Sequence, residues 1–463
     1  MSQHTRQKVR DQIHLFRKAP DKVPFADLLD PAMVQEAIHE VGLRFRHRFF
    51  TPLVVLWTFL SQVLSTDHSC RKAVSRLVAY LAVRGRPVCN PDIGGYCKAR
   101  GRLPLALIRR LVYKIVDAIR ARAPADWLWN GREVILVDGT TVSMPDTPEN
   151  QQEFPKQSGQ APGLGFPMAR LVGLISLTTG VLVDLAIGPC KGKETGETAL
   201  FRTLLDRLKA GEIVVGDRAF ASFFGVWQLI ERSVDGLFRM HQSRQYDFSR
   251  GHCVGVEDHI VVWTKPARPD WMDQETYDRI PGEVKLRELR VRVHQPGFRV
   301  EELVLVTTLL DEVVYTKEDL ANLYLKRWNI ELDLRSIKID MQMDVLRCQT
   351  PEGVRKEIWM HGLAYNLVRG VIAAAAEEHG EEPRSLSFKG ALQALESFRE
   401  ELGHAGAGGF ERLVEATLKT IASRRVGDRP NRVEPRAIKR RPKPHRLLKE
   451  PRREARKRLM AKK

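Results

Sequence analysis

Residues 313–344 read VVYTKEDLANLYLKRWNIELDLRSIKIDMQMD, and the apolar spacing predicts one helix from about Thr316 to Met341. At about 100° per residue, one strip of this helix carries an unusual set of polar side chains, with Arg335 close beside it. The strip consists of Tyr324, Arg327, Glu331 and Lys338. Two apolar stripes flank it, one formed by Leu323, Ile330, Leu334 and Ile337 and the other by Leu325, Trp328, Leu332 and Ile339.

The opposite side of the helix has a second polar arc, which already provides the solvated face that an amphipathic helix needs. This arc contains Lys326, Asn329, Asp333, Ser336 and Asp340. The first strip therefore needs another explanation. It could be an intrahelical ion pair, since Arg327 and Glu331 are four residues apart. Alternatively it faces a cleft, where Glu331 binds a cation and its neighbours meet an anionic substrate.

Composition indicates the class of partner. The chain has 463 residues, enough for two or three domains, and a formal charge of +18, which favours a polyanion such as nucleic acid. Ribosomal and membrane-surface proteins share such a balance. The six cysteines are scattered without zinc spacing, so reduced structural thiols are expected. The apolar run FFTPLVVLWTFLSQVL is short and contains polar residues, which predicts a buried helix in a cytosolic protein.

Residues 1–130 are predicted to form a helical DNA-binding domain. Their apolar residues recur at helical spacing, and basic clusters such as RQKVR, RFRHR and CKARGR accompany them. Each single cluster is explained equally well as a solvated basic face on a packing helix.

At Glu133 the pattern changes to extended. The segment EVILVDGTTVSMPD begins with an apolar strand that we expect to end at Asp138, and EIVVGDRAF predicts a second strand ending in Asp217. Between them the sequence predicts a hairpin turning at Thr179-Gly180 and a helix over residues 194–211. This order is compatible with a ribonuclease-H-like α/β sheet, in which the two aspartates would lie close together. Either aspartate alone could be a turn or helix-cap residue.

The remaining chain divides by pattern. Residues 131–244 are predicted to form the first part of the ribonuclease-H-like core, 245–300 a β-rich insertion, 301–422 the second part of the core, and 423–463 an extended basic tail. Trp263 and Trp271 lie in the insertion. Either could stack on an unpaired base, although ordinary packing is the more common role.

These motifs together resemble the DDE transposases of bacterial insertion sequences, specifically the IS-four group. The resemblance rests on VDGTTVSMPD with Asp138 and on VGDRAF with Asp217. It rests further on the group's Tyr-x2-Arg-x3-Glu-x6-Lys signature, which Tyr324, Arg327, Glu331 and Lys338 fit without departure. The similarity extends from about Gly95 through the last predicted helices.

The resemblance implies a ribonuclease-H-like catalytic domain interrupted by the insertion. It implies that Asp138, Asp217 and Glu331 bind two Mg²⁺ ions, with Mn²⁺ as a possible substitute, and that Tyr324, Arg327 and Lys338 hold DNA phosphates near the cleaved bond. The implied reactions are cleavage at transposon ends and joining to target DNA, by a homodimer on paired ends.

Two rival functions remain open at the level of sequence. One is an inactive, transposase-derived DNA-binding protein, which would have no need of three carboxylates beside phosphates. The other is a metal-dependent nuclease that cuts without joining, since the same carboxylates serve both reactions.

Overall fold

The computed structural model describes residues 29–46, 48–83, 85–157, 159, 163–292, 302–404, 407–427 and 448–461. The beginning of the predicted helical domain, the end of the predicted insertion and most of the basic tail therefore lie outside the described residues.

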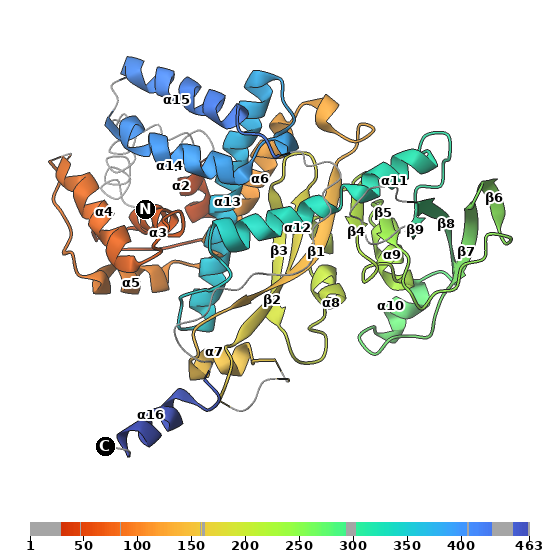
Figure 1. Ribbon diagram of the computed structural model, residues 1–463, viewed down its shortest axis with the longest axis horizontal. Helices are drawn as coiled ribbons and strands as arrows, with labels where there is room; N and C mark the ends of the chain where they lie inside the picture. Colours follow the sequence, from red (N-terminus) through yellow and green to blue (C-terminus); the bar gives the residue numbers. More distant parts are fainter. Residues whose placement is uncertain are drawn as a thin grey trace.

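One mixed sheet crosses the molecule (Figure 1). Its described strands are β1 Val134–Ser143, β2 Met168–Ser176, β3 Leu182–Pro189, β4 Ile213–Gly216, β5 Asp235–Arg239, β6 His252–Gly255, β7 Asp258–Thr264, β8 Glu283–Arg292 and β9 Glu302–Thr307. They lie in the order β3-β2-β1-β4-β5-β9-β8-β7-β6. β4 runs parallel to both β1 and β5, and the other neighbours are antiparallel. With helices packed around this sheet, the predicted α/β class is confirmed.

β1 is longer than the sequence predicted. We expected β1 to end at Asp138, but it continues to Ser143. Its antiparallel pairing with β2 extends to the pair formed by Ser143 and Met168. On its other side, the pairing with β4 stops at Val137 and Gly216. Asp138 therefore lies where β1 loses its parallel neighbour, which opens one edge of the strand at that residue.

The hairpin of β2 and β3 turns where predicted. Gly180 has a φ of +79°, and a Cβ there would lie 2.8 Å from the Arg369 guanidinium, so the turn needs glycine for both reasons. The helix predicted after it is shorter than expected. It consists of α8 (Glu197–Arg202) and a 3₁₀ turn at Leu205–Arg207.

The β-rich region after residue 245 extends the same sheet. β8 pairs with β9, which in turn pairs with β5, so hydrogen bonds run without a break from the central strands into this region. It also contains α10 (Gln274–Arg279), and α9 (Phe223–Ile230) packs against β5.

Both tryptophans of this region have packing roles. Trp263 is only 5 % exposed, and its indole N–H donates to Glu288 at 2.8 Å. Trp271 packs edge to face against Phe224, and the Arg202 guanidinium lies 3.8 Å from its ring centroid. Of the two roles that the sequence left open, the structure favours packing over base stacking.

The helix predicted over 316–341 is in fact three consecutive pieces, and Figure 1 shows the first two, α11 and α12, crossing over the sheet. They are α11 (Lys317–Leu325), α12 (Trp328–Arg335) and a π-helical turn at Ser336–Asp340. At the first junction the amide of Asn329 donates to the Lys326 carbonyl at 2.8 Å, and the backbone there forms short i to i+3 bonds. Such a side-chain bond competes with the regular helical ladder.

The buried face of this segment also differs from the prediction. Asp333, assigned to the solvated arc, is 1 % exposed, whereas Trp328, in a predicted apolar stripe, is 51 % exposed. Leu332 and Ile339 of that stripe are exposed as well. A pattern of polar residues cannot reveal that one of them has buried cationic partners.

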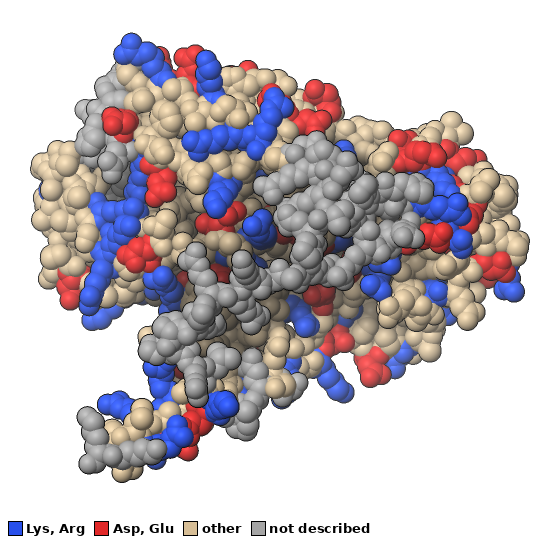
Figure 2. All heavy atoms as spheres, in the orientation of Figure 1, with Lys and Arg blue, Asp and Glu red and all other residues tan. Residues whose placement is uncertain are grey.

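Helices from both ends of the chain pack together beside the sheet. The N-terminal ones are α2 Pro31–Glu40, α3 Pro52–Val63, α4 Cys70–Val83, α5 Ile93–Arg102 and α6 Leu105–Arg122. The long helix α13 (Pro351–His379) packs against α3, α6 and β3, with most of its residues buried. Lys and Arg side chains gather where α4 and α5 form the surface (Figure 2). Arg71 of α4 and Lys98 and Arg102 of α5 are exposed.

The C-terminal part contains α14 (Phe388–His404) and α15 (Ala407–Ala422), as the sequence predicted. The tail was expected to be extended, which is wrong for its end, because Arg452–Met460 form α16. None of the residues of α16 is buried, in keeping with a tail that forms no core. All six cysteines are free thiols. Within the described residues, no helix is both long and apolar enough to cross a membrane.

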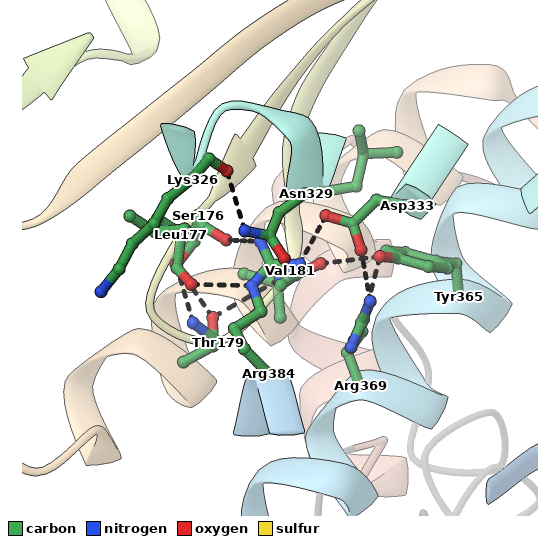
Figure 3. A network of polar contacts seen from close by, with 12 residues as sticks. Ser176, Leu177, Thr179, Val181, Lys326, Asn329, Asp333, Tyr365, Arg369 and Arg384 are labelled. Atoms are coloured by element: carbon green, nitrogen blue, oxygen red, sulfur yellow. Dashed lines mark hydrogen bonds and ion pairs between the residues drawn. The ribbon is translucent and has the colours of Figure 1, made fainter. Parts of the chain in front are cut away.

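A buried ion cluster fixes α12 against the rest of the fold (Figure 3). Asp333 pairs with Arg369 of α13 and with Arg384, whose Nη1 lies 2.6 Å from the carboxylate. Arg384 also donates to the carbonyl oxygens of Ser176 and Leu177 in the hairpin, at 2.6 and 2.7 Å. One carboxylate thus joins α12, α13 and the β2–β3 turn.

We predict that Asp333→Ala lowers the free energy of unfolding by about 3–5 kcal/mol, because it leaves two buried guanidinium groups without their counter-charge. Urea unfolding followed by circular dichroism measures the loss. Asp340→Ala, in the π-helical turn that follows α12, is the matched control and should cost less than about 1 kcal/mol. An equally small loss for Asp333→Ala would mean that the cluster contributes little to the fold.

Candidate active site

Asp138 lies in β1, and Asp217 lies directly after the neighbouring strand β4, so the two are close together as the sequence predicted. Val137 and Gly216 are the last paired residues of the parallel strands β1 and β4, and each is followed directly by an aspartate. Asp138 Oδ1 accepts a hydrogen bond from the Gly139 N–H, and Asp217 Oδ1 from the Ala219 N–H, both at 2.7 Å. The turn role considered for an isolated aspartate is therefore present at Asp217, but so is the pairing with a second aspartate.

Glu331 is joined to this pair by Arg327. The Arg327 guanidinium lies 2.7 Å from Glu331 Oε1 through Nη2 and 3.4 Å from Asp138 Oδ2 through Nη1. The intrahelical ion pair considered from the sequence thus exists. It is only half of the arrangement, because the same guanidinium also ties α12 to β1.

The other two signature residues lie on either side of Arg327 along the chain. Tyr324 is buried, which raises the pKa of its hydroxyl to about 12, while the charge of Arg327 acts in the opposite direction. Lys338 Nζ donates to Thr140 Oγ1 of β1 at 3.0 Å. Lys338 lies within the π-helical turn, a feature frequent at functional sites. Arg335, which the helical projection placed close beside the strip, is exposed.

Burial dominates the electrostatics of the site. It raises the pKa of Asp138 from 3.8 to about 6, and the nearby charges of Asp217 and Glu331 act in the same direction. The Gly139 N–H and Arg327 oppose this rise. The fold therefore keeps several carboxylates close to one another, although their mutual repulsion disfavours their charged forms.

The donor set is suited to a hard divalent cation. Carboxylate oxygens are the preferred protein ligands of Mg²⁺, and Asp138 and Glu331 already share one positive charge, that of Arg327. Over the described ranges, no three acidic, histidine or cysteine side chains converge closely enough to hold an ion.

Three further residues at the site were missed by sequence reasoning. Thr140 binds Lys338, and Arg239 at the end of β5 is close enough for its charge to act on Tyr324. Glu197 of α8 lies over Gly139, because a Cβ at that glycine would be 2.3 Å from Glu197 Oε1. The predicted helix carried Glu197, but only the packing of α8 on β1 brings it close enough to Asp217 for their charges to interact.

Known proteins with similar sequences support one family. Residues 129–367 match the family described as "Transposase DDE domain". Transposase InsG for insertion sequence element IS4, from Escherichia coli strain K12, is 28% identical over 424 residues, which cover 90% of this chain and 91% of that protein. Putative transposase InsZ from the same strain is 21% identical over 170 residues, covering 33% of this chain and 56% of its own.

Among solved structures, a cryo-EM structure of the piggyBac transposase synaptic complex with hairpin DNA aligns with a TM-score of 0.40. The aligned parts are 9% identical and cover 86% of this chain and 84% of that one. The family match includes both aspartates, Glu331 and the whole signature. The chain therefore belongs to the DDE transposases, in the IS4 group that its signature predicts.

Proposed function

We propose that this transposase cleaves phosphodiester bonds at the terminal inverted repeats of an insertion sequence and joins the freed ends to target DNA. The observation that supports this best is that Asp138 and Asp217 each follow the last paired residue of the parallel strands β1 and β4, with Glu331 tied to Asp138 through Arg327. A DNA-binding protein without catalysis would gain nothing from carboxylates that repel phosphates. This favours the enzyme over the inactive derivative.

We further infer that the core is ribonuclease-H-like. Support comes from the order β3-β2-β1-β4-β5, with an antiparallel β1–β2–β3 meander and parallel β4 and β5. In this arrangement β4 ends beside the middle of β1, which continues to Ser143. The second aspartate then adjoins the first, and α12 carries the glutamate over both.

In this proposal Asp138, Asp217 and Glu331 hold two Mg²⁺ ions, or Mn²⁺ in their place. Bound there, the ions would activate a water or a DNA 3′-hydroxyl for attack and stabilise the leaving oxygen. Each carboxylate contributes hard oxygen ligands while leaving positions open for phosphate. Arg327, released from Asp138 and Glu331, turns its guanidinium to the phosphate beside the cleaved bond, where its planar donors can bind two oxygens.

In this proposal Tyr324 and Lys338 provide the remaining contacts to DNA phosphates. The Tyr324 hydroxyl is protonated at neutral pH, and burial raises its pKa further, to about 12, so it can donate to a phosphate oxygen. Lys338 offers a compact positive charge next to β1. The basic surface of α4 and α5 and the basic C-terminal residues would extend this contact along double-stranded DNA, and paired ends imply a homodimer.

We predict that Glu331→Gln slows cleavage of end-containing DNA by roughly 10³-fold or more, because a metal ligand is lost, while DNA binding stays within a factor of a few. Cleavage on linear DNA with Mg²⁺ or with EDTA, together with gel-shift binding, measures both. Glu318→Gln on the exposed side of α11 is the control. Loss of binding together with cleavage would instead assign Glu331 a folding role.

We expect Lys338→Ala to weaken DNA binding and to lower the slope of log affinity against log salt by about 1, as for one lost phosphate contact. Lys326→Ala, at an exposed lysine in the junction between α11 and α12, should change the slope less. An unchanged slope and cleavage rate for Lys338→Ala would exclude the phosphate role.

The raised pKa of Asp138 predicts a stability change with pH. The pKa of Asp138 is 3.8 in the unfolded chain and about 6 in the folded protein. Between these two pH values the folded protein binds more protons than the unfolded chain, so its stability falls as the pH rises to about 6. Without metal, Asp138→Asn should therefore be more stable than wild type by about 3 kcal/mol above pH 6, and the gain should shrink towards pH 4. Urea unfolding at several pH values measures it. Asp126→Asn, at an exposed site, should give no such trend, and a stability loss for Asp138→Asn at pH 8 would contradict the prediction.

The ability to join DNA ends to a target distinguishes a transposase from a nuclease that only cleaves. A plasmid target incubated with pre-cleaved ends should yield covalent end-to-target products with the wild type and none with Asp217→Ala. Cleavage without any joined product would favour the nuclease reading.

A further inference from the structure

Two cysteine thiols from different helices lie against each other in the N-terminal helical part of the fold. Cys70 is the first residue of α4 and Cys97 belongs to α5, and these helices pack against each other and against α3 (Figure 1). The thiol of Cys97 has Cys70 as its side-chain hydrogen-bond partner. The fold thus brings together two sulfur atoms that are distant in the sequence.

The side-chain amide of Gln62 in α3 holds the two cysteines in this position. Its Nε2 donates to Cys70 Sγ at 3.7 Å. Its Oε1 accepts hydrogen bonds from the Tyr96 hydroxyl at 2.8 Å and from Arg100 Nη1 at 3.1 Å. Tyr96 and Arg100 lie in α5 on either side of Cys97 along the chain. One amide therefore ties the start of α4 to the turn of α5 that carries the second thiol.

The pair is open to small molecules from solvent. Cys70 and Cys97 are both partly exposed, whereas Cys348, the third thiol of this region, is buried. Burial also raises the pKa of Cys348 well above its ordinary value, which makes that thiol unreactive. Cys70 and Cys97 thus combine a sulfur partner with access for a small oxidant.

The acidity of Cys97 bears on how the pair reacts. Burial raises the pKa of its thiol and the neighbouring Cys70 acts in the same direction, while the charge of Arg100 opposes the rise. Because the thiolate is the reactive form, Cys97 alone reacts slowly at neutral pH. Its reaction with Cys70 is favoured by position, since the second sulfur is already in place.

We propose that Cys70 and Cys97 are a redox-active pair, which a peroxide converts into an intramolecular disulfide that clamps α4 to α5. Hydrogen peroxide oxidises one thiol to a sulfenic acid and releases one water. The second thiol attacks that sulfur, which forms the S–S bond and releases a second water. The two thiols lose two protons and two electrons, and the peroxide takes them up. A dithiol reductant reverses the reaction by thiol–disulfide exchange.

The disulfide would act on the basic surface of α4 and α5. Each cysteine directly precedes an exposed base, Arg71 after Cys70 and Lys98 after Cys97. A disulfide holds its two sulfur atoms about 2 Å apart and so fixes the positions of the two helices relative to each other. The arrangement of this surface would then depend on the oxidant, whether or not the surface binds DNA.

Peroxide treatment of the full chain, followed by alkylation of the free thiols and peptide mass mapping, tests the pair directly. We expect a disulfide from Cys70 to Cys97, with fragment ions that exclude Cys89, which lies in the same tryptic peptide as Cys97. The bond should form faster at about pH 8.5 than at about pH 7, because more of each thiol is ionised. Dithiothreitol should restore both thiols.

Three variants serve as comparisons. Cys253→Ser removes an exposed thiol of β6 and Cys348→Ala removes the buried neighbour, and both should leave the disulfide unchanged. Cys97→Ser should prevent it. The oxidised wild type should melt a few degrees higher than the reduced protein, because the cross-link restricts the unfolded chain, and Cys97→Ser should show no such rise.

Two results of the mapping would overturn the proposal. One is that Cys70 and Cys97 stay open to alkylation at a peroxide dose that oxidises the exposed Cys253. The other is a disulfide from Cys70 to Cys348. A lower melting temperature for the disulfide form would also overturn it, because the bond would then strain α4 and α5 instead of clamping them.

Discussion

The arrangement of the site depends on one buried carboxylate, Asp333. It lies two residues after Glu331 and pairs with guanidinium groups from α13 and from the segment that follows it. Because Arg384 also binds the carbonyls of the β2–β3 turn, the position of α12 is set relative to both the helices and the sheet. Arg327 then adds a weaker link to β1. Buried ion pairs often contribute more to a unique geometry than to stability, and the position of α12 is a geometry of this kind.

A second theme is that the site contains more negative charge than its fold neutralises. Arg327 serves two carboxylates at once, and burial raises the pKa of Asp138 and of Glu197. Such a concentration opposes folding and is tolerated because the surrounding strands and helices are well buried. Proteins commonly keep this kind of local strain where a ligand will relieve it. The same excess explains why the cationic Arg327 lies among the acids.

Sequence reasoning was most successful where the signal was local. The apolar strands before Asp138 and Asp217, the turn at Gly180 and the α/β class were all predicted, because each follows from side-chain period and glycine placement. It was least successful where distant residues decide. The burial of Asp333 depends on arginines 36 and 51 residues away, and the position of Glu197 depends on how α8 packs. At the break near Lys326 a side-chain amide binds the backbone carbonyl, a contact that a hydrophobic pattern does not register.

The continuity of the sheet has a consequence for how the region after residue 245 can vary. β9 has a neighbour on each side, β5 and β8, and its residues Leu305 and Val306 are fully buried. If the chain from β6 to β8 were deleted, β9 would become an edge whose unpaired backbone groups could recruit strands from other molecules. The sheet now ends instead at β6, a four-residue strand that is mostly exposed. The region thus protects the core from aggregation, whatever else it contributes, and it could be shortened safely only together with a replacement edge.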